Sequence, residues 1–142
     1  MDKNKETIKV LNELLQGEYM AVESFNNFIS RVEDDRIKIG LQDVQKQHRE
    51  NIDILANYIQ NIGGQADENL GMKGKMAELK LNMDLLKSND EDIIKEAIEG
   101  ETNGIEMTEK ILRGNLDDKS RDLTGKILAN DRKSIDKLNS LL

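Results

Sequence analysis

The sequence predicts an all-α four-helix bundle with one long crossover, and three observations lead to this prediction. The 142 residues include no proline, which allows long uninterrupted helices. Apolar residues recur at helical spacing in four long stretches. The second and third stretches are separated by a long connection with its own short apolar pattern, which is typical of a bundle with one crossover. The chain length suits a single domain, residues 1–142.

The first two helices are expected over residues 4–31 and 35–62. In the first, apolar residues from Ile8 onward keep spacings of three and four. The second follows the acidic residues 33–35, which place negative charge at a helix start, and stops at Gly63 and Gly64. The two stretches therefore predict a helical hairpin.

The crossover and the second hairpin complete the bundle. A crossover helix is expected over residues 71–87, where Met and Leu residues alternate at spacings of four and three. The third helix, residues 90–113, follows a capping-box pattern at residues 88–91. The fourth is expected over residues 117–141, after the turn that follows Gly114.

Composition and charge exclude several classes of function. The chain has no cysteine, so a disulfide framework or thiolate metal site is excluded. Its 28 acidic residues outnumber 21 Lys and Arg, and a net charge of -7 disfavours binding to nucleic acid or to anionic lipid. Because it also lacks an apolar signal segment or membrane span, we expect a cytoplasmic protein.

An internal repeat relates the two hairpins. Shifting the sequence by 83 residues places residues 15–18 on 98–101, and the same shift places residues 49–55 on 132–138 without a gap. A chance match is the alternative in a sequence so rich in Leu, Ile and Glu. The common offset in two separate helices favours duplication of one hairpin.

Four polar residues interrupt the apolar stripes, one in each long helix: Glu18, His48, Glu101 and Asp131. The first two are symmetric about residue 33 and the last two about residue 116, which both fall in predicted turns. Because antiparallel helices rise equally per residue, each pair should lie at one level of the bundle. An unpaired buried charge costs many kcal/mol, and a bound cation would offset this cost.

Each of these residues also has a purely structural interpretation. Glu18 or Glu101 alone is typical of the edge of a stripe, and a lone histidine is more often a surface or hydrogen-bonded group. Asp131 would fit a solvated face with an ion pair. A hydrogen-bonded cluster of carboxylates and imidazole without metal is a further alternative.

At these residues the sequence resembles the ferritin-like, diiron-carboxylate superfamily, and more narrowly its small bacterial ferritin-like domains. The resemblance rests on residues 17–19 and 100–101, on the first helix of each hairpin, and on residues 45–48 on the second helix. The superfamily uses one Glu from each of two helices and Glu-x-x-His from each of the other two. The resemblance implies that Glu18 and Glu101 are the single glutamates and that His48 is the first histidine.

The departures from this pattern fall on the carboxylates that would bridge two metal ions. Gln45 stands where the first Glu-x-x-His has its glutamate, and residues 128–131 replace the second motif, although Asp131 would still serve as a ligand. A degenerate diiron site that holds one ion is therefore favoured over a complete site. Candidate metal ligands are Glu18, His48, Glu101, Asp131 and Gln45.

The resemblance implies a metal-binding protein with a role in iron-related redox chemistry or metal handling under stress. The expected metal is iron or another divalent ion, manganese or zinc, as a single ion or none. The alternative is a structural or interaction bundle that has lost metal binding. The methionine stripe of the crossover favours core packing or a homodimer contact.

Overall fold

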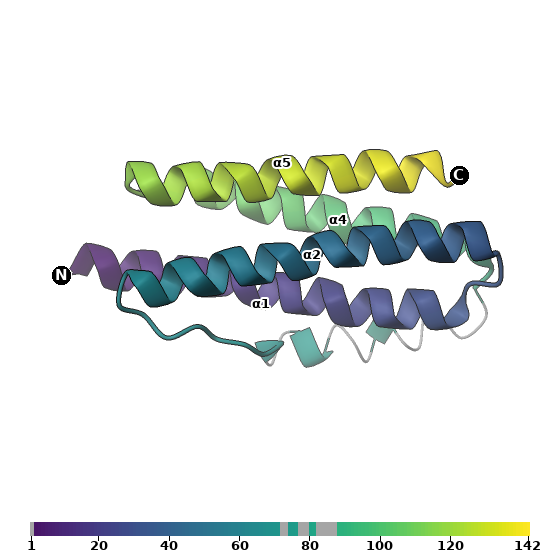
Figure 1. The fold of residues 1–142 in the computed structure, drawn as a ribbon, viewed down its shortest axis with the longest axis horizontal. Coiled ribbons are helices and arrows are strands. Elements are labelled where there is room, and N and C mark those ends of the chain that lie inside the picture. Colours follow the sequence, from purple (N-terminus) through teal and green to yellow (C-terminus); the bar gives the residue numbers. More distant parts are fainter. Residues whose placement is uncertain (1, 72–73, 77–79, 82–87) are drawn as a thin grey trace.

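The computed structural model describes residues 2–71, 74–76, 80–81 and 88–142. Its four long helices are α1 (Asp2–Arg31), α2 (Asp35–Asn61), α4 (Asp90–Leu112) and α5 (Asp118–Ser140). They lie side by side along the long axis of the molecule, and the described start of the connection after α2 lies against α1, where Asn12 donates to the Gln65 carbonyl at 3.0 Å (Figure 1). The prediction of an all-α four-helix bundle with a long crossover is confirmed.

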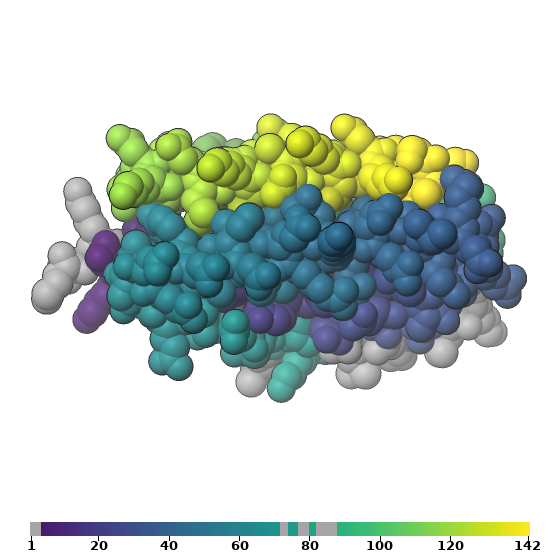
Figure 2. Space-filling model, viewed as in Figure 1, coloured from purple at the N-terminus to yellow at the C-terminus, as the bar shows by residue number. Residues whose placement is uncertain are grey.

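The helices form a closed ring of antiparallel neighbours. The chain direction alternates so that α1 packs against α2 and α4, and α5 packs against α4 and α2. In the space-filling view, the side chains of α2 and α5 meet along one face of the molecule (Figure 2). None of the described helices is long and apolar enough to span a membrane.

Side-chain caps fix where the helices begin. Asp34 accepts hydrogen bonds from the backbone of Arg36 and Ile37 at the start of α2, and Asp117 caps α5 in the same way. The α4 cap is Asn89, which accepts from the Asp92 N–H at 2.9 Å. The capping-box pattern at residues 88–91 had placed that cap one residue earlier.

The turn between α1 and α2 is tied to the beginning of α4. Both carboxylate oxygens of Asp90 accept backbone N–H groups from this turn, at 3.0 Å from Glu33 and 3.0 Å from Asp34. This contact joins the two hairpins at one end of the bundle.

Part of the predicted crossover helix can be compared with the structure. Residues 74–76 and 80–81 are helical, whereas residues 72–73, 77–79 and 82–87 lie outside the described part of the chain.

Gly63 has a φ of +91°, which suits the end of α2. A Cβ on Gly64 would lie 2.9 Å from Ile8 of α1, so glycine permits the crossover to leave close to α1.

The apolar core falls into two clusters. One contains Phe25, Val44 and Ala97, and the other contains Leu15, Ile52 and Ile127. His48 lies between Val44 and Ile52 in the sequence, so α2 contributes to both clusters and carries a polar residue between them. The fold therefore places a polar layer near the middle of the bundle.

Candidate metal centre

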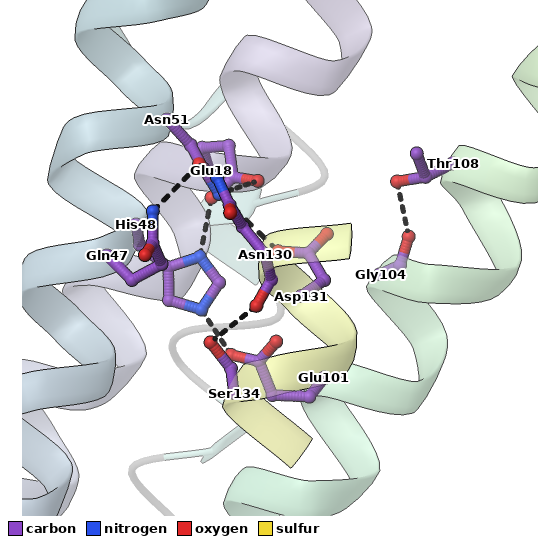
Figure 3. Close-up of polar contacts among 10 residues, drawn as sticks. All are labelled: Glu18, Gln47, His48, Asn51, Glu101, Gly104, Thr108, Asn130, Asp131 and Ser134. Atoms are coloured by element: carbon purple, nitrogen blue, oxygen red, sulfur yellow. Dashed lines mark hydrogen bonds and ion pairs between the residues drawn. The ribbon is translucent and has the colours of Figure 1, made fainter. Parts of the chain in front are cut away.

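Four side chains converge in this polar layer, one from each long helix. Glu18 comes from α1, His48 from α2, Glu101 from α4 and Asp131 from α5, and they point toward one another (Figure 3). Their exposed fractions are 6%, 3%, 4% and 4%, respectively. The structure thus brings together the four residues that interrupt the apolar stripes.

His48 joins the two hairpins through both of its ring nitrogens. Nδ1 lies 2.5 Å from Oε2 of Glu18, and Nε2 contacts Oε1 of Glu101. The ring also packs against Phe25, with ring centroids 5.6 Å apart. The imidazole is therefore held between two carboxylates and an apolar wall.

These contacts raise the pKa of His48 well above its usual value of 6.5. Burial alone would lower this pKa, but the Glu18 charge and the hydrogen bonds with Glu101 and Glu18 outweigh burial. In the metal-free protein His48 is therefore an imidazolium at neutral pH. Both of its N–H groups donate to carboxylates.

The pKa of Asp131 is also raised, but here burial is the main cause of the increase. Burial, followed by the charge of Glu18, raises its pKa from 3.8 to about 8, with His48 opposing the shift and Glu101 adding to it. At neutral pH without metal, Asp131 therefore holds a proton. The cluster contains more carboxylates than a single imidazolium can neutralise.

Asn51 completes the cluster, and sequence reasoning missed it. Its Nδ2 donates to Oε1 of Glu18 at 3.3 Å and to Oδ1 of Asp131 at 3.4 Å. Its Oδ1 accepts from Asn130 at 3.0 Å and from Gln47 at 3.3 Å. The carboxamide thus links α1 to α5 across the core.

A sequence signal for Asn51 was present. It lies three residues after His48 and four before Leu55, which places it on the buried stripe of α2. The repeat offset relates Asn51 to Ser134, which is also buried. A search for every polar residue on both stripes would have found the pair.

Gln45 is buried, but the structure does not bring it into the cluster. Its Nε2 donates to the Val22 carbonyl at 2.9 Å and to Oδ1 of Asn26 at 2.7 Å. Leu128, the residue that the repeat relates to Gln45, packs in the core. Among the described residues, no hydrogen bond of Gln45 reaches Glu18, His48, Glu101 or Asp131.

The donor set suits a divalent metal ion. Ligand atoms of Glu18, His48 and Asp131 all lie within 4.8 Å of one another. Within the described part of the chain, Oε2 of Glu101 and Oδ2 of Asp131 have no hydrogen-bond partner, although both side chains are buried. Carboxylate oxygens with one imidazole nitrogen are ligands that iron, manganese and zinc accept.

A family model matches residues 6–114, about three quarters of the chain. It is described as a domain of unknown function, DUF2383. The match includes Glu18, His48 and Glu101 and ends before Asp131. None of the curated protein sequences matches this chain.

Solved structures share the fold over nearly the whole chain at low sequence identity. A ferritin-like, diiron-carboxylate protein from Bacillus anthracis is 21% identical, with a TM-score of 0.75 and coverage of 100% of this chain and 99% of that chain. A dodecameric thioferritin from Bacteroides fragilis, described as bacterioferritin-related, is 16% identical, with a TM-score of 0.77 and coverage of 96% and 84%.

A third similar structure is a two-domain protein from Anabaena variabilis with a DJ-1/ThiJ/PfpI-like domain and a ferritin-like domain. It is 18% identical, with a TM-score of 0.77 over 97% of this chain. Our chain spans only 36% of the length of that protein. By its sequence the chain belongs to the DUF2383 family, and its fold is that of the ferritin-like four-helix bundles.

Proposed function

We propose that this protein binds one divalent metal ion per chain in the polar layer and acts in iron-related redox chemistry or metal handling under stress. The observation that supports this most strongly is the convergence of three buried carboxylates on one histidine, with two carboxylate oxygens that lack partners in the described structure. Iron is the first candidate, and manganese and zinc are the alternatives.

Glu18 and Asp131 would hold the ion together with one nitrogen of His48, because ligand atoms of these three residues lie within 4.8 Å of one another, whereas Glu101 contacts the opposite ring nitrogen from Glu18. Ligation requires His48 to lose a proton, because an imidazolium has no free lone pair. The other ring nitrogen keeps its N–H and donates to the carboxylate that it contacts now, which fixes the orientation of the ring. Asn51 would position Glu18 and Asp131 through its two donated hydrogen bonds.

A bound iron ion would supply one-electron redox chemistry, and the buried site would restrict access of water to it. The donor set favours one ion over two. Leu128 offers no ligand atom, and the hydrogen bonds of Gln45 go to α1. The two carboxylates that would bridge a pair of ions are therefore absent from this sequence.

Metal analysis of protein purified without a histidine tag tests this proposal. After anaerobic loading with Fe(II), Mn(II) or Zn(II) and removal of free metal, we expect one ion per chain. Glu101→Gln should lower metal affinity about 10–100-fold, because it removes the charged partner that orients His48. Glu106→Gln makes the same chemical change at an exposed position of the same helix and should bind metal like the parent.

A structural role without metal is the second candidate, and one observation favours it. Both nitrogens of His48 already contact carboxylates, so the imidazolium itself serves as a counter-ion that joins the hairpins. If this role is the whole function, no loaded metal stays with the parent protein. Glu101→Gln would then lower the stability of the bundle without any metal-dependent effect.

The proposal includes a cytoplasmic location and self-association into a homodimer or larger assembly. The B. fragilis relative is described as dodecameric. Met76 on the crossover is 69% exposed, which leaves an apolar side chain available for a contact between copies. Sedimentation at several protein concentrations would measure the assembly directly.

A further inference from the structure

A cavity of about 450 Å³ lies between α1 and α4 and reaches the polar layer. We call it the α1–α4 cavity. The described residues that line it include the four residues of the cluster, and much of the remaining lining is apolar: Leu14, Ala21, Phe25, Phe28, Ala97 and Met107. Its volume lies within the range of about 300–1,000 Å³ that is typical of sites for small organic molecules.

Small residues on both helices create this space. Gly17, Ala21 and Ser24 line the cavity from α1, and Ala97, Gly100 and Gly104 line it from α4. A Cβ added to Gly100 or Gly104 would meet no atom within 4 Å, and one added to Gly17 would meet only the Met107 sulfur, at 3.9 Å. Gly100 and Gly104 are exposed, so the α1–α4 cavity is open to solvent on this side, and its largely apolar lining suits a small organic occupant.

The charge of the polar layer selects the kind of occupant. The carboxyl groups of Glu18, Glu101 and Asp131 face one histidine there, so acidic groups outnumber basic ones, and Oε2 of Glu101 and Oδ2 of Asp131 have no partner among the described residues. A carboxylate or phosphate placed beside them would be repelled, whereas an ammonium group would donate hydrogen bonds to both. Farther out, the lining includes Lys80 together with Glu96 and Glu99, so these three residues carry no excess of positive charge.

We infer that the α1–α4 cavity binds an apolar organic cation, such as a primary alkylamine. The hydrocarbon body lies between α1 and α4, and the ammonium group donates to Glu101 and Asp131. This inference goes beyond the proposed metal site and requires no bound ion. The ammonium group and a metal ion both use Asp131, so each should weaken binding of the other.

Calorimetric titration of the metal-free protein with octylamine, octanoate and octanol tests the inference. We expect octylamine to bind about tenfold more tightly than either of the other two, because only its head group pairs with the carboxylates. Equal or tighter binding of octanoate or octanol would overturn the assignment of the head group. Absence of binding by all three would overturn the assignment of the cavity.

Filling the cavity provides the second part of the test. Gly104→Leu places a side chain in the open space and replaces glycine with a better helix former, so the bundle should fold and lose octylamine binding. The matched control is Gly125→Leu on α5, where an added Cβ also meets no atom within 4 Å and which does not line the cavity. Circular dichroism verifies folding, and Gly100→Leu serves if Gly104→Leu does not fold.

Undiminished octylamine binding in the folded cavity-filling variant would overturn the inference. A parent dimer that this variant converts to monomers would also overturn the inference, because a second copy of the chain would then occupy the α1–α4 cavity. Metal binding is measured separately in the same variants. Absence of metal binding by the parent protein, together with octylamine binding by that parent, would contradict the proposed function alone.

Discussion

Asp131→Asn should stabilise the metal-free protein at alkaline pH and reduce the dependence of its stability on pH. The pKa of Asp131 is raised from 3.8 to about 8, mainly by burial. At about 1.4 kcal/mol per pKa unit, this shift means that folding disfavours the charged form of Asp131, relative to the protonated form, by roughly 6 kcal/mol. That amount is comparable to the whole stability of an ordinary domain, about 5–15 kcal/mol.

The direction of the pH effect follows from which state holds the proton. Between pH 3.8 and about 8, folded Asp131 keeps its proton while the unfolded chain has released it, so stability falls as pH rises through this window. His48 acts in the same direction, because its raised pKa adds stability below 6.5 that is lost as pH rises through the folded pKa. The metal-free parent should therefore be less stable at pH 8 than at pH 6.

We expect Asp131→Asn to recover roughly half of the electrostatic cost above pH 8, about 3 kcal/mol, because asparagine still buries a polar group. Urea unfolding with a chelator present, followed by circular dichroism at several pH values, measures this gain. Asp136→Asn, at an exposed position of the same helix, is the matched control and should change little. A parent stability that is flat or rises from pH 6 to 8, or no gain in Asp131→Asn, would refute the electrostatic argument.

Three further predictions concern the same layer. His48→Gln should lower the stability of the metal-free protein at pH 6 by about 3 kcal/mol in urea unfolding, because Glu18 and Glu101 lose their counter-ion; an unchanged midpoint would contradict this. Asn51→Leu should lower the free energy of unfolding by about 2 kcal/mol in the same assay, because the buried oxygens of Glu18 and Asp131 lose their donor. An unchanged stability would show that Asn51 does not bridge these residues. Gln45→Glu combined with Leu128→Glu should raise bound iron from at most one toward two ions per chain. A glutamate at position 45 cannot donate to the Val22 carbonyl, so its side chain is free to turn inward. If the folded double variant binds no more iron than the parent, the two new glutamates do not point into the site.

The fold was predictable because helix periodicity is a local property of the sequence. The four convergent residues were predictable for a related reason. Antiparallel helices rise equally per residue, so two residues that are equally far from the turn between their helices lie at one level of the bundle. This holds for positions 18 and 48, and for positions 101 and 131. The repeat then places the second pair opposite the first.

The different roles of Gln45 and Asn51 could not be predicted from the sequence. Both lie three residues from His48, so spacing alone treats them alike. The structure separates them, because Gln45 finds the Val22 carbonyl of α1 as a partner, whereas Asn51 finds Glu18 and Asp131. Which neighbouring helix supplies the partner depends on helix rotation and side-chain reach, and a one-dimensional pattern contains neither.

The raised pKa of Asp131 likewise could not be predicted from the sequence. The motif at residues 130–132 was compatible with a solvated face carrying an ion pair. The structure buries Asp131 beside Glu18, and desolvation then dominates its protonation. The α1–α4 cavity was also not predictable, because small residues such as Gly100 and Gly104 are compatible with either close helix packing or open space.

Anaerobic titration of the untagged, metal-free protein with Mn(II), in buffers of different ionisation enthalpy, tests the proposed metal site most directly. The heats give both the number of ions bound and the number of protons released. We predict one ion per chain at neutral pH with release of one or two protons, from His48 and Asp131, and clearly weaker binding in Glu101→Gln but not in Glu106→Gln. No binding, or binding without proton release that Glu101→Gln leaves unchanged, would contradict a metal site built from these residues.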